Sequence, residues 1–369
     1  MSSDDTGAAL AIEVRRDDWT TTREVPLESR ELEPGEVLLR IDAFALTSNN
    51  VTYATLGDML GYWRFFPAAD EGWGRVPAFG FADVAESLVE GLDPGERVYG
   101  YYPMATHLRV AAKATGRGTF DSVAPHRAEL PAFYNRYLLT GADPGYDAAH
   151  EAEQMLLRPL FSTSFLIDDA LADEGFHGAD AVVLSSASSK TAYGTAFLLA
   201  QRGDVQVIGL TSAGNADWVR SLGIYDSVVT YDAVDTLDSE GRVAYVDFSG
   251  DGALRGALHH GLGERLVLDM IVGVTHHDAM TPQADLPGPQ PAMFLAPLRG
   301  QQRATEWGAE VLLARIGTAW GEFMSLVGRA DGPAVLNVTR SQGAQEVQDT
   351  WRAIVGGRSR PDAGHVASL

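Results

Sequence analysis

The chain has 369 residues, of which 45% are hydrophobic and 21% charged, which is typical of a soluble globular protein long enough for two domains. Its net charge of −22 argues against binding to nucleic acid or to an anionic membrane, because both require clustered Lys and Arg. It contains no cysteine, which excludes disulfides, thiolate metal ligands and thiol catalysis. The N-terminal MSSDDTGAAL is acidic, unlike a secretory signal, and no apolar run reaches the roughly 18 residues of a membrane span, so we expect a cytoplasmic protein.

The sequence of the first third of the chain predicts β structure. Strand-like segments at 10–19 and 36–46, and again at 96–102 and 105–112, are separated by Pro-Gly turns, which predicts a compact, barrel-like β domain. From about residue 127 the pattern becomes helical, and 151–175 carries apolar residues at intervals of three and four.

Strands and helices then alternate. Expected strands lie at 182–186, 205–212, 227–232, 244–250, 266–277 and 292–297, with expected helices at 191–203 and 215–223. This alternation predicts an α/β domain with a parallel sheet covered on both faces. A long helix from Ala304 to Val327, a strand at 334–339 and a final helix at 344–357 are expected to complete the chain.

The turn after the strand at 182–186 has the position of a phosphate-binding loop but almost no glycine. It reads SSASSKTA, from Ser185 to Ala192, and leads into a helix. Three interpretations of this loop remain open: it is a dinucleotide site, a triphosphate site, or a loop kept only for structure. The triphosphate interpretation depends on the residues SKT, which resemble the end of the triphosphate-binding motif G-x-x-x-x-G-K-T. Both glycines of that motif are missing here.

Several segments resemble the medium-chain dehydrogenase/reductase superfamily. They are EPGEVLLRIDAFALTSNN, GRVPAFGFADVAES, GERVYGYYPMATHLRV and RSQGAQEVQDTWRAIVGG, and the similarity is greater to its zinc-free quinone-oxidoreductase and enoyl-reductase branch. TSNNVTYATLGD and YVDFSGDGALRGAL are similar to a subfamily described as a domain of unknown function. The resemblance implies a GroES-like β domain at 1–150, a doubly wound Rossmann domain at 151–298 and a return to the first domain at 299–369.

The resemblance also implies a nicotinamide dinucleotide cofactor. SASSKTAYGTAFLLAQRG (186–203) fits without a gap on the branch's GASGGVGSAAVQLAKALG. The implied cofactor-binding residues are Ser188, Ser189, Lys190, Thr191, Ala192, Thr211, Ser212, Tyr231, Ser249 and Gly250. Thr211 and Ser212 stand where an NAD-selective site places a carboxylate, so NADP(H) is expected over NAD(H), with Arg220 as a candidate partner of the 2′-phosphate.

The segment after the strand at 36–46 lines the active site in this family. Tyr53 is the candidate proton donor, and Asn49 and Asn50 are candidate oxyanion or amide-positioning donors. The alternative is a polar turn capped by its own Asn side chains. The aromatic-rich stretch at 57–77 suggests a substrate pocket, a dimer contact or a satellite core, and His107 is expected to be structural.

No metal site is expected. His276, His277 and Asp278 form the one compact cluster of possible ligands, but adjacent side chains on an extended segment point in opposite directions. Together with this, the resemblance implies a zinc-independent, NAD(P)H-dependent oxidoreductase that reduces an activated C=C bond or a carbonyl in a small apolar or aromatic substrate, and that forms a homodimer. The alternative is a non-catalytic or noncanonical member that uses the fold as a binding scaffold.

Overall fold

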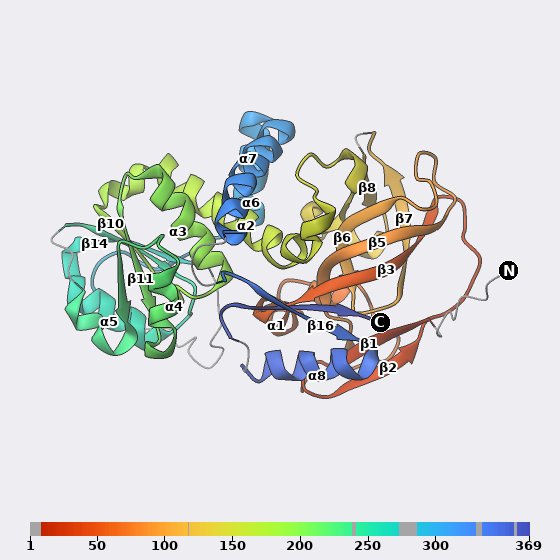
Figure 1. The fold of residues 1–369 in the computed structure, drawn as a ribbon, viewed down its shortest axis with the longest axis horizontal. Coiled ribbons are helices and arrows are strands. Elements are labelled where there is room, and N and C mark those ends of the chain that lie inside the picture. Colours follow the sequence, from red (N-terminus) through yellow and green to blue (C-terminus); the bar gives the residue numbers. More distant parts are fainter. Residues whose placement is uncertain (1–8, 117, 238–240, 273–285, 330–333, 358–359) are drawn as a thin grey trace. The chain divides into compact units, whose positions relative to one another are not determined.

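The computed structural model describes residues 9–116, 118–237, 241–272, 286–329, 334–357 and 360–369, and it divides into two compact units. The first unit consists of residues 1–156 and 336–369, and the second of residues 157–335. Figure 1 shows the elements of both. Each unit is described by itself.

The first unit is built mainly from antiparallel strands. Its elements are β1 (Leu10–Arg15), β2 (Thr22–Pro26), β3 (Glu36–Leu46), α1 (Ser48–Thr55), β4 (Trp73–Gly74), β5 (Pro77–Ser87), β6 (Arg97–Pro103), β7 (His107–Ala114), β8 (Thr119–Ser122), β9 (Arg136–Leu139), β16 (Asn337–Gln342), α8 (Ala344–Val355) and β17 (Ala363–Ser368).

Strand β3 closes these strands into a barrel. Its neighbours run in the order β3-β5-β6-β9-β8-β7, and β7 pairs with β3 again, so the ring has no free edge. The last residues of β3 pair instead with β17, which brings the C-terminal end of the chain into the same sheet. Trp351 of α8 is completely buried in the unit's core, and its Nε1 donates a hydrogen bond to the Trp19 carbonyl at 2.7 Å.

The second unit is a doubly wound α/β domain. Its elements are α2 (Glu151–Asp173, which begins in the first unit), β10 (Ala181–Leu184), α3 (Lys190–Arg202), β11 (Gln206–Thr211), α4 (Ala216–Ser221), β12 (Ser227–Thr230), β13 (Val243–Asp247), α5 (Gly252–Leu262), β14 (Leu266–Ile271), β15 (Ala292–Met293), α6 (Ala296–Trp307) and α7 (Ala309–Val327).

All six strands of its sheet are parallel, in the order β12-β11-β10-β13-β14-β15. The chain therefore winds outward from β10 in one direction and from β13 in the other, and the order reverses between these two strands. This is the Rossmann order, in which dinucleotides bind at the carboxyl ends of the strands beside the reversal. All four residues of β10 are buried, as expected for a strand covered on both faces. The expected fold class is confirmed.

Three local expectations differ from the structure. The region 127–150, expected to be helical, holds strand β9 and short 3₁₀ turns, because its residues complete the barrel. The helix expected from Ala304 to Val327 is two helices, α6 and α7, because Gly308 between them has a φ of +89°. The final strand, β17, was not expected.

The second unit also extends beyond residue 298, the end expected for the Rossmann domain. Phe323 of α7 stacks on Phe161 of α2 with ring centroids 4.7 Å apart, and it packs edge-on against Phe197 of α3 at 5.3 Å. Arg299 and Arg303 of α6 pair with Asp169 of α2. These contacts hold α6 and α7 within the second unit, and the chain returns to the first unit at Leu336.

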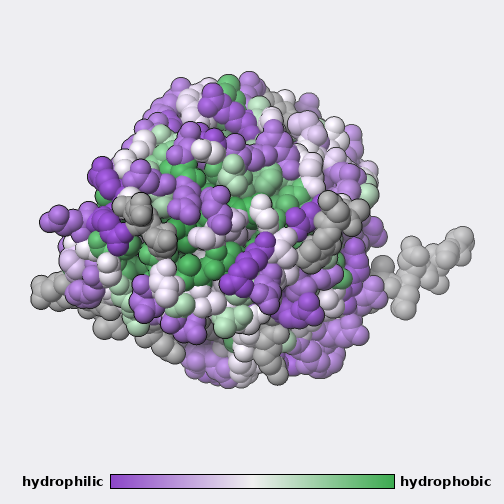
Figure 2. Space-filling model, turned by 60° about the vertical axis from the view of Figure 1, so that its left-hand side comes forward, coloured by the Kyte–Doolittle hydropathy of each residue, from purple (hydrophilic) through white to green (hydrophobic). Residues whose placement is uncertain are grey.

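On the face in Figure 2, purple hydrophilic residues surround a central group of green hydrophobic ones. Among the described residues, no helix is both long and apolar enough to cross a membrane.

Candidate functional site

The loop between β10 and α3 has an unusual backbone that a tyrosine supports. Ser186 has a φ of +46°, in the left-handed region that residues other than glycine rarely adopt. Its backbone N–H donates to the Tyr231 hydroxyl at 3.0 Å. The next residue, Ala187, pairs with the Leu210 carbonyl through its N–H, and its own carbonyl accepts from the Tyr225 hydroxyl at 2.8 Å. The expected cofactor residue Tyr231 therefore contacts the loop itself.

The expected pyrophosphate residues form the start of α3. Ser189 is the N-cap, and its Oγ accepts the Ala192 N–H at 3.3 Å. Ser188, Ser189, Lys190 and Thr191 are half-buried, whereas Ala192 is fully buried. The helix start thus presents backbone N–H groups and partly exposed hydroxyls at the carboxyl edge of the sheet, an arrangement suited to an anionic group.

The turn after β13 is organised by the Asp247 carboxylate, which is completely buried. Its Oδ1 accepts from the Ser249 Oγ at 2.8 Å, from the Gly250 N–H at 3.1 Å and from the Ser185 Oγ at 2.8 Å. The Ser185 hydroxyl in turn accepts the Phe248 N–H at 2.9 Å. One carboxylate therefore ties together the two turns that flank the reversal of strand order.

The hydrogen-bond network around Asp247 also includes Arg255, His259 and Asp269, to which the sequence analysis assigned no role. Arg255 of α5 pairs with both Asp247 and Asp269, and His259 lies 2.8 Å from Asp269 Oδ2 through its Nε2. Burial raises the pKa of Asp269, although His259 and Arg255 act in the opposite direction. The sequence did contain a pattern that could have predicted this network. Arg255 and His259 are four residues apart, and so on one face of a helix, and that helix follows a strand that ends in Asp.

The end of β11 carries no carboxylate for a ribose diol. Thr211 is buried and Ser212 is exposed. Asn215 donates through Nδ2 to the Ser188 Oγ at 3.1 Å, which connects this turn to the loop before α3. Arg220 forms an exposed ion pair with Asp217 at 2.9 Å.

In the first unit, the candidate residues Asn49 and Asn50 lie in the first turn of helix α1. Asn50 is buried, its Oδ1 accepts the Thr47 N–H at 2.7 Å, and its Nδ2 donates to the Pro77 carbonyl at 2.8 Å. Thr47 accepts the Asn49 N–H in return, which completes a capping box. These contacts match the alternative reading of the segment as a turn capped by its own side chains.

Tyr53 points from α1 into a cluster of aromatic rings. Its ring centroid lies 4.6 Å from that of Tyr62, 5.6 Å from Tyr101 and 6.2 Å from Tyr134. Burial and the neighbouring Tyr62 raise the pKa of Tyr53 well above its usual range, while a hydrogen bond with the Asn49 side chain lowers it. Among the residues that the structure describes, the buried Tyr101 hydroxyl has no hydrogen-bond partner. We call these four residues the tyrosine cluster.

The aromatic stretch at 57–77 divides between two environments. Phe65 and Phe66 are buried beside the tyrosine cluster in a satellite core, with Arg127 held over Phe66 and donating to the Phe65 carbonyl at 2.9 Å. Trp63 packs into the main core of the unit. His107 is half-buried and contacts the Thr106 Oγ at 3.0 Å through Nδ1.

The possible metal ligands His276, His277 and Asp278 lie outside the described residues. Within the described ranges, no group of three or more His, Asp and Glu side chains could hold a metal ion.

The fold is similar to those of several solved structures. CurA from Vibrio vulnificus in complex with NADPH has a TM-score of 0.63 at 13% identity, covering 98% of this chain and 99% of that one. The yhdH oxidoreductase from Salmonella enterica in complex with NADP has a TM-score of 0.52 at 15% identity, with 98% and 99% covered. A mutant of Etr1p in complex with NADP and crotonyl-CoA has a TM-score of 0.57 at 12% identity, with 98% and 100% covered.

These likenesses confirm the expected medium-chain reductase fold. No curated protein matches the sequence. The family model described as protein of unknown function, DUF2855, matches residues 44–360. That match spans most of the chain, so the protein belongs to the DUF2855 family.

Proposed function

We propose that this protein is a zinc-independent, NADP(H)-dependent reductase acting on an activated C=C bond or a carbonyl in a small apolar or aromatic molecule. The observation that carries the proposal is the network at the reversal of strand order, where Asp247 joins the turn after β10 to the turn after β13. In Rossmann sheets this edge is where a dinucleotide binds.

The residues at this edge fit the cofactor. The start of α3 supplies N–H donors for the pyrophosphate, and Lys190 at its first helical position supplies a positive charge. Ser249 and Gly250, held by Asp247, would contact the nicotinamide ribose. The absence of a carboxylate at Thr211 and Ser212 favours the 2′-phosphate of NADP(H).

The bound cofactor would supply the hydride, and the chain must supply a proton and stabilise the developing negative charge on the substrate oxygen. We propose that the Tyr53 hydroxyl donates that proton. Asn49 would hold the Tyr53 hydroxyl, and Asn50 would fix the helix that carries both. The aromatic side chains packed around Tyr53 are suited to a small apolar or aromatic substrate.

We further propose a cytoplasmic homodimer. Strand β15 is an edge strand of the parallel sheet, and Met293, Leu295 and Leu298 beside it are 54%, 43% and 61% exposed. Such an apolar edge is suited to burial against a second copy. Sedimentation velocity should give a dimer for the wild type and a monomer for Met293→Glu; a wild-type monomer would contradict this.

The scaffold alternative also has a specific observation in its favour. Ser186 occupies a position that glycine suits better, and its N–H already bonds Tyr231, so the loop has fewer free donors and less room than a glycine-rich loop. A dinucleotide titration separates the two functions.

The experiment is a thermal-shift titration with NADPH, NADH and ATP, in the wild type, Ser189→Asp and Ser189→Asn. A ligand that binds only the folded state stabilises it by about 2.7 kcal/mol at a hundredfold excess over its Kd. Both Asp and Asn are good N-caps, so both variants should retain α3, but only Asp places a negative charge beside the pyrophosphate. We expect NADPH to stabilise the wild type and Ser189→Asn and not Ser189→Asp. No shift with either nicotinamide nucleotide would favour the scaffold, and a shift with ATP would favour a triphosphate site.

A further inference from the structure

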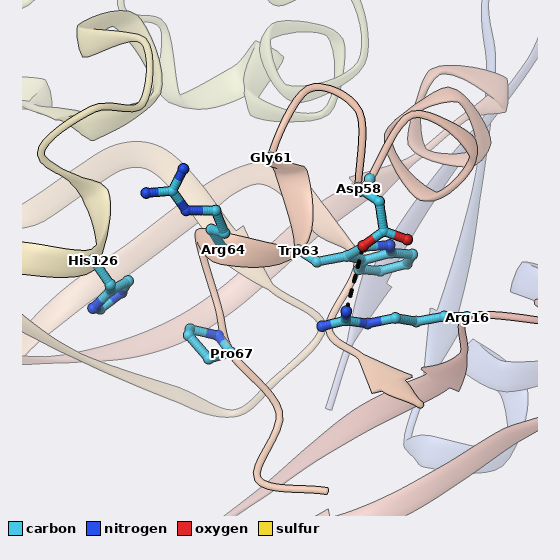
Figure 3. A pocket seen from close by; sticks show the side chains of 8 residues that line it. Arg16, Asp58, Gly61, Trp63, Arg64, Pro67 and His126 are labelled. Carbon is cyan, nitrogen blue, oxygen red and sulfur yellow. Dashed lines mark hydrogen bonds and ion pairs between the residues drawn. The ribbon is translucent and has the colours of Figure 1, made fainter. Parts of the chain in front are cut away.

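The first unit contains a pocket that the proposed reaction does not use. It has a volume of about 220 Å³ and is lined by Arg16, Gly57, Asp58, Gly61, Trp63, Arg64, Pro67 and His126. Figure 3 shows Arg16 and Asp58 beside the Trp63 indole, with Arg64, Pro67 and His126 on the other side. Because an apolar cavity of about 150 Å³ accepts benzene, this volume accommodates a small ring with one substituent.

Trp63 gives the pocket a rigid aromatic edge. The side chain is almost fully buried, and two glycines make room for it. A Cβ at Gly57 would lie 2.1 Å from the Trp63 Nε1, and a Cβ at Gly74 would lie 2.5 Å from its Cε3. No side chain larger than glycine fits at either position without displacing the indole. The ring is therefore held in place before any ligand arrives.

Arg16 is anchored in the pocket but only loosely paired. Its Nε donates to the Trp73 carbonyl at 3.0 Å, and its guanidinium lies 5.5 Å from the centroid of the Trp63 ring. Its contact with Asp58 is 3.5 Å, longer than the roughly 2.7–2.9 Å of a good charge-assisted bond. The Asp58 side chain is 80% exposed, so a carboxylate with better geometry can take its place at low cost.

The surrounding charges favour an anion. Arg64 also lines the pocket, and its ion pair with Glu129 is exposed and 3.3 Å long. Burial lowers the pKa of His126, and the charges of Arg127 and Arg64 lower it further, which reflects positive surroundings. In a chain with a net charge of −22, the pocket has two arginines whose paired carboxylates, Asp58 and Glu129, are both largely exposed, so an acidic ligand can compete for them.

We propose that this pocket binds a small aromatic carboxylate, with the carboxylate on Arg16 and the ring against Pro67 and the accessible edge of Trp63. The guanidinium fork matches a carboxylate in two parallel hydrogen bonds, and Pro67 with the edge of the indole supplies the apolar contact. The site is distinct from the tyrosine cluster, because the 57–67 segment turns Tyr62, Phe65 and Phe66 into the cluster and contributes Trp63, Arg64 and Pro67 to the pocket.

The test is isothermal titration of the full-length protein with benzoate and, as its neutral counterpart, benzyl alcohol. We expect benzoate to bind and benzyl alcohol to bind at least about tenfold more weakly, because only the former makes charge-assisted bonds. Arg16→Gln should weaken benzoate binding by a similar factor. Arg40→Gln, which removes an exposed arginine from another surface of the unit, should leave it unchanged.

The Asp58→Asn variant provides the more specific test of the proposed carboxylate site. It removes the carboxylate that competes for Arg16, so benzoate should bind about two- to fivefold more tightly than to the wild type. This variant alters an exposed side chain, so its folding is not at risk. The proposal is wrong if benzoate binds neither the wild type nor Asp58→Asn, if benzyl alcohol binds equally well, or if Asp58→Asn weakens binding.

Discussion

The Nε2 of His259 lies 2.8 Å from the Oδ2 of Asp269, and both side chains are completely buried. The other ring nitrogen, Nδ1, lies 2.7 Å from the Pro287 carbonyl oxygen. A carbonyl can only accept, so Nδ1 carries a proton, and a second proton is shared between Nε2 and Asp269. His259 therefore connects Pro287, in the segment before β15, to Asp269. Asp269 pairs with Arg255, and Arg255 pairs with Asp247 in the turn that we propose binds the cofactor.

Removing this imidazole should destabilise the protein. His259→Ala leaves the Pro287 carbonyl without its His259 partner and leaves Asp269 with Arg255 alone, and an unsatisfied buried polar group costs about 1–3 kcal/mol. The matched control is His260→Ala, which removes the exposed neighbouring histidine and should change the free energy of unfolding by less than about 0.5 kcal/mol. Urea unfolding measures both. Equal effects of the two substitutions would show that His259 makes no special contribution.

The Asp269 carboxyl should make the free energy of unfolding depend on pH in a predictable direction. Burial raises its pKa above the usual 3.8, so the folded chain holds this proton more tightly than the unfolded chain does. The contribution stabilises the folded state at low pH and is lost as the pH rises from about 4 through the raised pKa. The free energy of unfolding, compared between wild type and Asp269→Asn, isolates this effect because other carboxylates contribute equally to both. A difference that does not change with pH would contradict the assignment.

Tyr53→Phe should lower turnover and leave NADPH affinity nearly unchanged. A proton donor acts in the transition state, so its loss reduces the rate, by about 10²–10⁴-fold for general acid catalysis, without affecting ground-state cofactor binding. The assay is NADPH oxidation with 2-cyclohexenone. Tyr146→Phe is the control, since the Tyr146 hydroxyl bonds Glu151 outside the tyrosine cluster and should be dispensable for turnover. Normal turnover in Tyr53→Phe would remove this residue from the mechanism.

The parallel sheet was predictable because its signals are local. Each strand is a short apolar run, and in β10 all four residues are buried, so the composition of the run alone identifies it. Strand β17 was not predictable in this way. Its sequence, AGHVAS, has little periodicity, and it forms a strand because it pairs with β3 on one side and with β16 on the other.

The candidate sites were predictable in position but not in contacts. The sequence located the loop before α3, yet it could not show that Tyr231 supports the backbone of Ser186. It also grouped the aromatic residues of 57–77 together, whereas the fold separates Phe65 from Trp63 only two residues away. Both arrangements depend on segments distant in sequence, and local patterns carry no information about such pairings.

Metal chelation should leave the protein unaffected. The proposed mechanism assigns the stabilisation of substrate charge to hydrogen-bond donors and needs no Lewis acid. We therefore expect EDTA dialysis to leave the melting temperature and NADPH-dependent turnover unchanged. Stoichiometric zinc in the purified protein, lost together with activity and restored on its re-addition, would contradict this prediction.

Lys190 offers the most direct test of how the loop binds a cofactor. It occupies the first turn of α3, next to the N-cap Ser189, where a pyrophosphate would place two negative charges. Charge-assisted hydrogen bonds contribute about 1.5–3 kcal/mol, so Lys190→Ala should raise the Kd of NADPH about ten- to a hundredfold. The chain's other lysine, Lys113, is exposed on β7, and Lys113→Ala is therefore a control that removes the same charge elsewhere.

If backbone N–H groups alone hold the pyrophosphate, Lys190→Ala will resemble Lys113→Ala, while Ser189→Asp will still abolish binding by repulsion. If neither Lys190→Ala nor Ser189→Asp changes the affinity for NADPH or NADH, the loop does not bind the cofactor. The proposed reductase activity would then be refuted, because the other helix start beside the reversal of strand order, that of α5, is capped by the Asp251 carboxylate, which would repel a pyrophosphate.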